Sequence, residues 1–246
     1  MLKRFLTVII PAVIAFAAGA GEVKVDFSGK QVPLDLKNGA VIRNNILEFE
    51  KKRSFAEVPG TLDMDFSNGG TLMMTVRVFD LDKDPGKFRF FAEKRGSFLF
   101  GVTNGKFNFS LCNKGKWNIA LIGGELPENN KFVHLAAFAR RVYNPEQSRY
   151  GFQLEVYVNG EKILSKFNHV KEYESAKHAL TRINVPERYA NFNGSVASFS
   201  FTDKALTPND IFEAAKKDPY IKIQTPGLVE VPEKVNSNLK RLAGKV

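Results

Sequence analysis

The chain has 246 residues, of which 43% are hydrophobic and 25% are charged, a composition typical of a globular protein and not of a disordered or fibrous one. A single cysteine excludes an internal disulfide and a zinc site built from cysteines, and 3 histidines argue against a histidine-rich metal centre. The unusual features are a formal net charge of +10 and 22 phenylalanines.

Residues 1–20 have the pattern of a secretory signal peptide. Lys3 and Arg4 precede an apolar run over residues 5–18, and the small residues Ala18, Gly19 and Ala20 follow it. As a helix the run is too short to cross the roughly 30 Å hydrocarbon core of a bilayer. We therefore expect cleavage after Ala20, a secreted or periplasmic location and no membrane span. An uncleaved anchor is the alternative.

The rest of the chain alternates apolar and polar residues over short runs, which is the period of a half-buried strand. Asn-Gly pairs at 104–105 and 159–160 mark tight hairpins, because both residue types tolerate positive φ. Short strands separated by hairpin signals predict an all-β antiparallel sandwich or barrel. The predicted strands are residues 23–27, 46–50, 72–79, 87–91, 98–102, 106–111, 132–140, 151–159 and 195–202.

One short helix is predicted near the C-terminus. Thr207 can cap it, Pro208 suits the first helical position, and Asp210 follows the cap by three residues. The helix is expected to end at Lys217, before Asp218 and Pro219. We expect the folded domain to cover residues 21–217 and residues 218–246 to form a basic, extended tail.

Four segments carry motifs in a fixed order: residues 47–49 with 54–59, residues 69–78, residues 132–137 with 154–161, and residues 192–201 with 204–207. Together they resemble the LamG-like jelly roll of the concanavalin A-like lectin and glucanase superfamily, from about Asn44 to Ala214. The resemblance implies two stacked antiparallel sheets, one of them concave, with the first segment forming an opening hairpin. Two positions depart from the family pattern, because Ala197 replaces the usual Asp and Phe132 replaces the usual Trp.

The side-chain pattern agrees with a two-sheet sandwich. In residues 154–158 the apolar side chains share one face, whereas Glu155 and Tyr157 share the other. In the last strand Ala197, Phe199 and Phe201 are expected to share the core face. Each strand then has one core face and one polar face, as a sandwich requires.

The sequence contains no motif that predicts catalysis. Laminarinase-type glucanases, to which the resemblance extends, carry two carboxylates in an E-x-D-x-x-E pattern on one strand face, and no such triplet is present. Neither G-x-S-x-G, H-E-x-x-H nor a phosphate-binding glycine loop occurs. We therefore expect no enzymatic activity and no catalytic residues.

A structural calcium ion is the candidate cofactor. Asp80, Asp82 and Asp84 place carboxylates at alternate positions of a loop, and calcium prefers several oxygen ligands. Lys83 opposes a cation, and Pro85 stands where an EF-hand loop has glycine. A solvated loop without metal is the alternative.

Carbohydrate binding is the leading functional hypothesis, because sugar sites combine an aromatic platform with polar side chains that fix the hydroxyl groups. Residues 140–150 interrupt two strands that most relatives join by a short loop, and they supply tyrosines, amides and arginines. The alternatives are an extended hairpin with solvated charges and a tryptophan that only packs. The candidate ligand-binding residues are Trp117, Tyr143, Asn144, Arg149 and Tyr150.

The expected partner is a polysaccharide or a glycoprotein. The lysines and arginines are scattered and do not cluster with stacking aromatic residues, so nucleic acid is not expected. The net positive charge would attract acidic polysaccharide. The alternative function is an extracellular or cell-envelope module for protein–protein interaction or structure on the same fold. The oligomeric state stays open.

Overall fold

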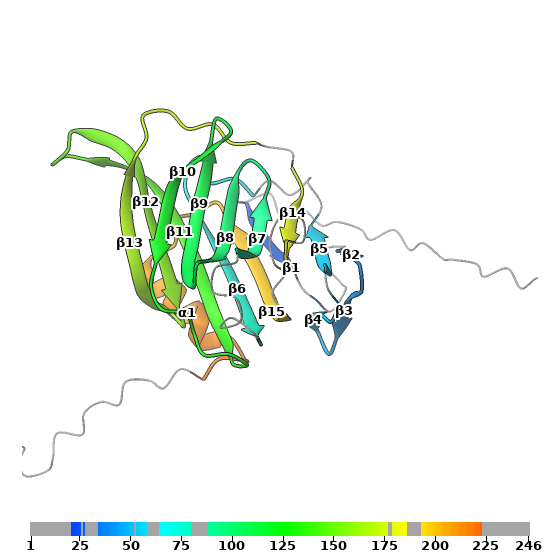
Figure 1. The fold of residues 1–246 in the computed structure, drawn as a ribbon. Helices are drawn as coiled ribbons and strands as arrows, with labels where there is room; N and C mark the ends of the chain where they lie inside the picture. The colour runs from blue at the N-terminus through cyan, green and yellow to red at the C-terminus, as the bar shows by residue number, and fades with distance from the viewer. Residues whose placement is uncertain are drawn as a thin grey trace, which may run out of the picture.

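The computed structural model describes residues 21–25, 27, 34–51, 53–58, 64–79, 88–176, 179–185 and 193–222. Within these residues the regular structure consists of strands and one helix, α1 (Pro208–Lys217), near the C-terminal end (Figure 1). The strands are β1 (Glu22–Val25), β2 (Asp35–Lys37), β3 (Ala40–Arg43), β4 (Ile46–Phe49), β5 (Phe55–Val58), β6 (Gly70–Val78), β7 (Arg89–Lys94), β8 (Phe98–Thr103), β9 (Lys106–Asn113), β10 (Lys116–Gly123), β11 (Phe132–Asn144), β12 (Arg149–Val158), β13 (Glu161–His169), β14 (Thr181–Ile183) and β15 (Gly194–Thr202).

The strands form two antiparallel sheets stacked as a jelly-roll sandwich (Figure 1). Sheet A has the order β13-β12-β11-β6-β15-β4-β3, and β1 also pairs with β15. Sheet B has the order β10-β9-β8-β7-β14-β5-β2. The predicted all-β sandwich with one short C-terminal helix is confirmed.

The core between the sheets is rich in phenylalanine. Phe66 is fully buried at its centre, and its ring meets the rings of Phe98 and Phe109 from sheet B at centroid distances of 5.3 and 5.4 Å. From sheet A the ring of Phe201 approaches to 5.1 Å. All three contacts are edge-to-face, the geometry that the aromatic quadrupole favours. The surplus of phenylalanine therefore fills the space where the two sheets face each other.

The Asn-Gly pairs form the hairpins predicted for them. Asn104 and Gly105 between β8 and β9, and Asn159 and Gly160 between β12 and β13, all have φ between 50° and 84°. Positive φ at both central residues gives the turn twist that matches the flanking strands. Asn159 also fixes this turn to β11, because its N–H donates to the His134 carbonyl at 2.7 Å and its side-chain oxygen accepts from the His134 N–H at 3.0 Å.

The predicted helix is confirmed with its cap. The Thr207 hydroxyl accepts from the Asp210 N–H at 3.2 Å, and the Asp210 carboxylate accepts from the Thr207 N–H at 2.9 Å. The helix packs on the outer face of sheet A, which points away from sheet B, and Ile211 is fully buried there. Its apolar neighbours on the sheet are Ala136, Phe138 and Tyr157. Tyr157 is only 1% exposed, so this face of β12 is covered. The sequence pattern had predicted a solvated polar face here.

The opening hairpin implied by the family resemblance is wrong. Strand β4 pairs with β3 and β15 in sheet A, whereas β5 pairs with β2 and β14 in sheet B. Leu47 of β4 and Val58 of β5 are both fully buried. The chain therefore crosses between the two layers here, and each strand contributes to the core from its own sheet.

The expected face of Ala197 is also wrong. The register of β15 against β6 shifts between Val196 and Ser198, which marks a β-bulge at Ala197. A bulge adds one residue and changes which side chains point inward. Val196, Phe199 and Phe201 are consequently buried, while Ala197 is half-buried.

Two sequence predictions concern residues outside the part of the chain that the structure describes. The signal peptide over residues 1–20 and the tail from residue 223 onward lie outside the described residues. Residues 218–222 follow α1 and lie against the sandwich, where the rings of Tyr220 and Phe132 are 4.9 Å apart. In the described part of the chain, no helix combines the length and apolar character needed to cross a bilayer.

His134 is a buried titratable residue on the outer face of sheet A. It is 4% exposed and lies opposite Thr75 of β6, whose hydroxyl donates to Asp218 after the helix. Burial lowers the pKa of His134 to about 4, and the nearby Asp218 carboxylate opposes this shift only in part. The imidazole is therefore neutral at pH 7.

Replacing the central ring should destabilise the fold strongly. We expect Phe66→Ala to lower the free energy of unfolding by about 3–5 kcal/mol, because it leaves a cavity between the sheets. Phe88→Ala, which removes a ring that is 44% exposed, should cost less than about 1 kcal/mol. Urea denaturation measures both. Equal losses in the two variants would contradict a core centred on Phe66.

Acid should weaken the fold through His134. Between its pKa of about 6.5 in the unfolded chain and about 4 in the folded protein, only the unfolded state binds the proton. Stability therefore falls as the pH drops through this interval, by on the order of 3 kcal/mol from this residue. His134→Gln should show a correspondingly shallower pH dependence in urea denaturation from pH 7 to pH 4. An unchanged dependence would show that His134 does not carry this effect.

Candidate functional site

The tip of the β11–β12 hairpin extends beyond its neighbours in sheet A. Strand β6 pairs with β11 only as far as Ala139, and β13 pairs with β12 only from Gly151. Residues 140–150 form the projecting end, called the arm below (Figure 1). Its turn is closed by Asn144, whose side-chain oxygen accepts from the Gln147 N–H at 3.1 Å. The inserted segment is thus an extended hairpin, one of the alternatives that the sequence leaves open.

Four of the five candidate ligand-binding residues lie on the arm. Tyr143 and Tyr150 face each other across the hairpin with ring centroids 4.9 Å apart, and they are 51% and 57% exposed. Asn144 and Arg149 form the next cross-strand pair, so their side chains point to the opposite face. The arm therefore presents an exposed tyrosine pair on one face and an amide with a guanidinium on the other.

A shallow hollow of about 440 Å³ lies along the arm and the adjoining strands. We call it the arm hollow. Apolar, aromatic and polar side chains all line it, and two of the candidate residues are among them. The lining residues are Arg140, Val142, Tyr143, Asn144, Pro145, Glu146, Gln153, Glu155 and Phe167.

Phe167 of β13 supplies a half-buried ring to the arm hollow. It lies opposite Gln153 in the register and packs directly against the backbone of Gly151. A Cβ atom at Gly151 would come within 2.6 Å of the Phe167 ring and 2.2 Å of the Asn168 carbonyl oxygen. The absence of a side chain at Gly151 is therefore what allows the ring to lie against β12.

The polar side chains beside this ring form an ordered network. Glu155, which is 9% exposed, accepts from the Tyr157 hydroxyl, and from Lys162 and Ser165 at 3.3 Å each. Gln153 donates to the Ser165 hydroxyl at 2.6 Å. Burial and the hydrogen bond to Glu155 raise the pKa of Tyr157, so its hydroxyl stays a donor. The network holds Glu155 and Gln153 in fixed orientations. The side-chain amide oxygen of Gln153 takes no part in these bonds.

Arg140 adds a positive charge at the rim of the arm hollow. It is exposed, lies opposite Gln153 on the neighbouring strand, and has no carboxylate within ion-pair distance among the described residues. A guanidinium offers several donors in a fixed planar arrangement. Arg140 is thus available to donate hydrogen bonds to a ligand.

Trp117 lies elsewhere. It is on β10 at the edge of sheet B, next to a register irregularity between Lys116 and Ile119, and it is 40% exposed. It does not line the arm hollow. The structure therefore brings Tyr143 and Asn144 to one hollow and leaves Trp117 apart from it.

Sequence reasoning missed Phe167, Gln153, Glu155 and Arg140 as site residues. A signal existed in β13, where the apolar residues Ile163, Leu164 and Phe167 closely follow the Asn-Gly turn. Nothing in the local pattern shows that Phe167 meets Gly151, because that contact depends on the register of β12 with β13.

The proposed metal ligands Asp80, Asp82 and Asp84 lie outside the described residues. Across the residues that the structure does describe, no three histidine, cysteine or acidic side chains gather closely enough to hold a metal ion. Cys112 is 1% exposed, and burial raises the pKa of its thiol. It lies on the face of β9 opposite the core residue Leu111, where it packs as a small apolar residue.

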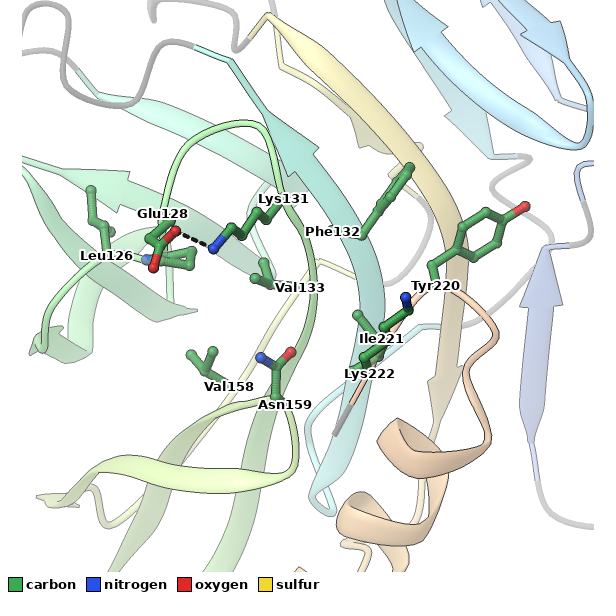
Figure 2. A pocket seen from close by; sticks show the side chains of 11 residues that line it. Leu126, Glu128, Lys131, Phe132, Val133, Val158, Asn159, Tyr220, Ile221 and Lys222 are labelled. Carbon is green, nitrogen blue, oxygen red and sulfur yellow. Dashed lines mark ion pairs between the residues drawn. The ribbon is translucent and has the colours of Figure 1, made fainter. Parts of the chain in front are cut away.

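A larger groove of about 650 Å³ lies where residues 126–133, the β12–β13 turn and residues 220–222 meet (Figure 2). Three of its polar side chains already have partners. Glu128 pairs with Lys131, and the Asn159 side-chain oxygen accepts from the His134 N–H at 3.0 Å.

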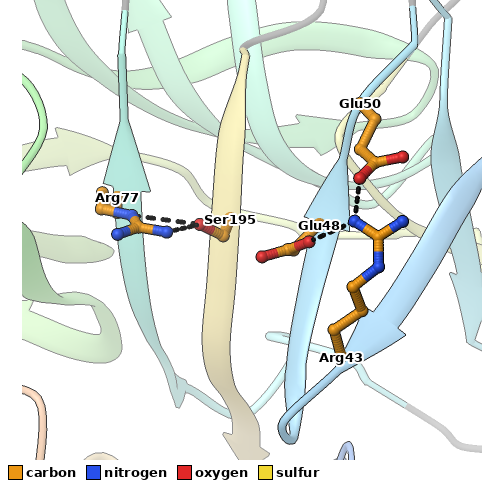
Figure 3. A network of polar contacts seen from close by, with 5 residues as sticks. All are labelled: Arg43, Glu48, Glu50, Arg77 and Ser195. Carbon is orange, nitrogen blue, oxygen red and sulfur yellow. Dashed lines mark hydrogen bonds and ion pairs between the residues drawn. The ribbon is translucent and has the colours of Figure 1, made fainter.

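A row of polar contacts crosses the outer face of sheet A farther along (Figure 3). Arg43 pairs with both Glu48 and Glu50, and Arg77 donates to the Ser195 hydroxyl at 3.2 and 3.3 Å. The hollow beside them has a volume of only about 160 Å³. These contacts join β3, β4, β15 and β6 and so stabilise the sheet.

Residues 54–212 match the family described as "Concanavalin A-like lectin/glucanases superfamily". This match covers more than half of the chain. A comparison with curated proteins finds no matching sequence.

Several solved structures share the fold. The receptor binding domain of botulinum neurotoxin C/D mosaic serotype has a TM-score of 0.59 and 15% identity, over 78% of this chain and 48% of that one. The binding domain of Paraclostridial Mosquitocidal Protein 1 has a TM-score of 0.58 and 17% identity, over 76% and 48%. The botulinum neurotoxin serotype D ligand binding domain in complex with N-acetylneuraminic acid has a TM-score of 0.57 and 15% identity, over 78% and 47%.

The chain thus spans about half the length of these structures. At such low identity the likeness establishes the two-sheet architecture and nothing about which residues bind. The geometry of the arm hollow must therefore identify the ligand class.

The close contact at Gly151 can be tested directly. Gly151→Ala should lower the free energy of unfolding by about 1–3 kcal/mol, because the new methyl group overlaps the Phe167 ring and the Asn168 carbonyl. Adding Phe167→Ala relieves the overlap with the ring, so the double variant should lose less than the sum of the two single losses. Urea denaturation of the three variants measures this coupling. Additive losses would show that the ring does not rest on Gly151.

Proposed function

Because the chain belongs to the concanavalin A-like lectin/glucanases superfamily, we propose that it is a non-catalytic module that binds carbohydrate in the arm hollow. The observation that carries this proposal is the Phe167 ring placed beside the oriented polar side chains of Gln153 and Glu155 at the base of the arm. One fold hosts many ligands, so the chemistry of the site decides between them.

The arm hollow suits a sugar ring. A pyranose has an apolar face of C–H groups and a rim of hydroxyl groups, and protein sites match these with an aromatic surface and a few fixed polar side chains. Phe167 supplies the aromatic surface. Arg140 can donate to hydroxyl oxygens, and the Gln153 carbonyl and Glu155 carboxylate can accept from hydroxyl groups. The hollow is open along the arm, which leaves room for a longer glycan.

The carboxylates in the arm hollow favour binding without turnover. Hydrolysis of a glycosidic bond needs one acid and one base or nucleophile on either side of the scissile bond. Three donors hold the Glu155 carboxylate, which places it as a hydrogen-bond acceptor. Glu146 lies in the exposed turn at the tip of the arm. This arrangement supports recognition of a sugar by Glu155 without proton transfer to it.

The proposed setting is outside the cytoplasm. The signal-peptide pattern of residues 1–20 supports export. One structure of similar fold is a ligand binding domain in complex with N-acetylneuraminic acid, which supports a glycan ligand for this architecture. The proposed partner is a polysaccharide or a glycoprotein. A calcium ion at Asp80, Asp82 and Asp84 remains a prediction.

A second candidate function is protein–protein interaction, and the edge of the arm favours it. Residues 140–144 of β11 extend past β6, and no described strand pairs with them on that side. An exposed strand edge presents unpaired N–H and C=O groups, to which an extended chain can add as a further strand.

Binding to a glycan array by the full chain, followed by calorimetry with the glycan that binds, tests the proposal. Phe167→Ala should weaken binding about 10-fold or more, because it removes the aromatic surface. Trp117→Ala is the matched control, since it removes an exposed ring from the other sheet, and should leave the affinity unchanged.

Three results would contradict the proposal. Equal losses in Phe167→Ala and Trp117→Ala would mean that the arm hollow is not the site. A protein that binds no glycan but is cross-linked through the arm to a protein partner would favour the second candidate function. Release of shortened sugars from any bound polysaccharide would overturn the non-catalytic assignment.

A further inference from the structure

A separate hollow lies on the outer face of sheet A beside α1. Strands β1, β6, β11 and β15 line one side and the helix lines the other, around a volume of about 450 Å³. We call it the helix hollow. It shares no lining residue with the arm hollow, so it stands independently of the proposed carbohydrate site.

The helix hollow is acidic, although the chain as a whole carries a net charge of +10. Carboxylates outnumber ammonium groups among its lining residues, leaving an excess of negative charge. The carboxylates belong to Glu22, Asp210, Glu213 and Asp218, and the ammonium groups to Lys24 and Lys217. An excess of one sign in a concave site favours a ligand of the opposite sign.

Not all of these carboxylates are equally available. Asp210 caps α1, and Asp218 accepts from the Thr75 hydroxyl and from the Tyr220 N–H. Glu22 pairs with Lys24 at 3.0 Å. Within the described part of the chain Glu213 has only a long contact of 3.8 Å with Lys216, so it is the carboxylate most able to exchange its partner.

His134 gives a second, independent indication of a ligand. It lines the helix hollow, is 4% exposed, and its Nδ1 atom has no hydrogen-bond partner among the described residues. A buried polar atom without a partner costs free energy that a bound donor can recover. Because burial keeps the imidazole neutral at pH 7, one ring nitrogen carries a lone pair and can accept a hydrogen bond.

The remaining wall combines apolar and hydroxyl groups. Met73 of β6 and Leu206 and Ala214 on the helix side supply apolar surface, and Ser198 and Ser200 of β15 supply hydroxyl groups. A short chain of methylene groups can pack on the first set while a cationic head reaches the acidic groups.

We propose that the helix hollow binds a primary alkylammonium group, carried either by a free diamine or by a lysine side chain of a partner. The ammonium group lies between Glu213 and the imidazole of His134. The methylene groups that carry it pack against Met73 and Leu206.

Calorimetric titration of the full chain tests the site with two probes of equal length, cadaverine and 1,5-pentanediol. We expect saturable binding of cadaverine and none of the diol, because only the amine is charged. Equal responses to both probes would overturn the proposal, since the acidic lining would then not contribute.

Two variants that change the charge of the helix hollow in opposite directions locate the binding site. Glu213→Gln should weaken cadaverine binding about 5-fold, whereas Lys217→Gln should strengthen it by removing a competing cation. Glu128→Gln is the matched control in the groove of Figure 2 and should change nothing. Loss of affinity in Glu128→Gln equal to that in Glu213→Gln would show that only overall charge matters and would overturn the site.

A third probe distinguishes the two sources of the amine. Nα-acetyl-lysine methylamide presents a lysine side chain without a free α-amine. If it competes with cadaverine, the hollow accepts a lysine of a partner, and if it does not, the hollow is selective for a free amine. NMR of the His134 ring should show a shift on saturation with cadaverine, and an unperturbed ring at saturation would contradict binding at this place.

Discussion

The ring of Phe66 contacts aromatic rings from both sheets. The structure depends on this burial of apolar side chains between the two layers. The two pleated sheets bury most of their apolar side chains against each other. Every strand must therefore give alternate side chains to the interior, which leaves the outer faces and strand ends for other uses. Both proposed ligand sites lie on the outer face of sheet A, where no strand layer covers them.

That outer face is divided into two regions of different chemistry. Near its middle, α1 covers apolar residues of β11 and β12, and the acidic hollow forms beside the helix. At the arm, the same two strands continue without a covering element among the described residues, and Phe167 lies beside Gln153, Glu155 and Arg140. Strand β12 links both regions through Glu155 and Tyr157, whose side chains bond to each other. Strand β12 thus contributes both to the arm hollow and to the apolar surface that α1 covers.

Local signals predicted what local structure determines. Alternation predicted most of the long strands, the Asn-Gly pairs predicted two hairpins, and Thr207 with Asp210 predicted the helix start. Features that depend on pairing between distant segments were not predictable in this way. The bulge at Ala197 needs the register of β15 on β6, and the site ring of Phe167 needs the register of β13 on β12. Short strands such as β2 and β14 lack enough residues to show a period.

The dependence of α1 on the sheet has a consequence for how the molecule is made. A helix of ten residues is marginal in water by itself, and this one is stabilised by packing on strands that precede it in the chain. Gly160 of the β12–β13 turn lies against Phe212, so the surface that receives the helix includes this turn. During synthesis the ribosome releases these strands before the helix. Until residue 217 emerges from the ribosome, the apolar surface of sheet A that α1 covers stays exposed on the nascent sandwich, where a chaperone can bind it.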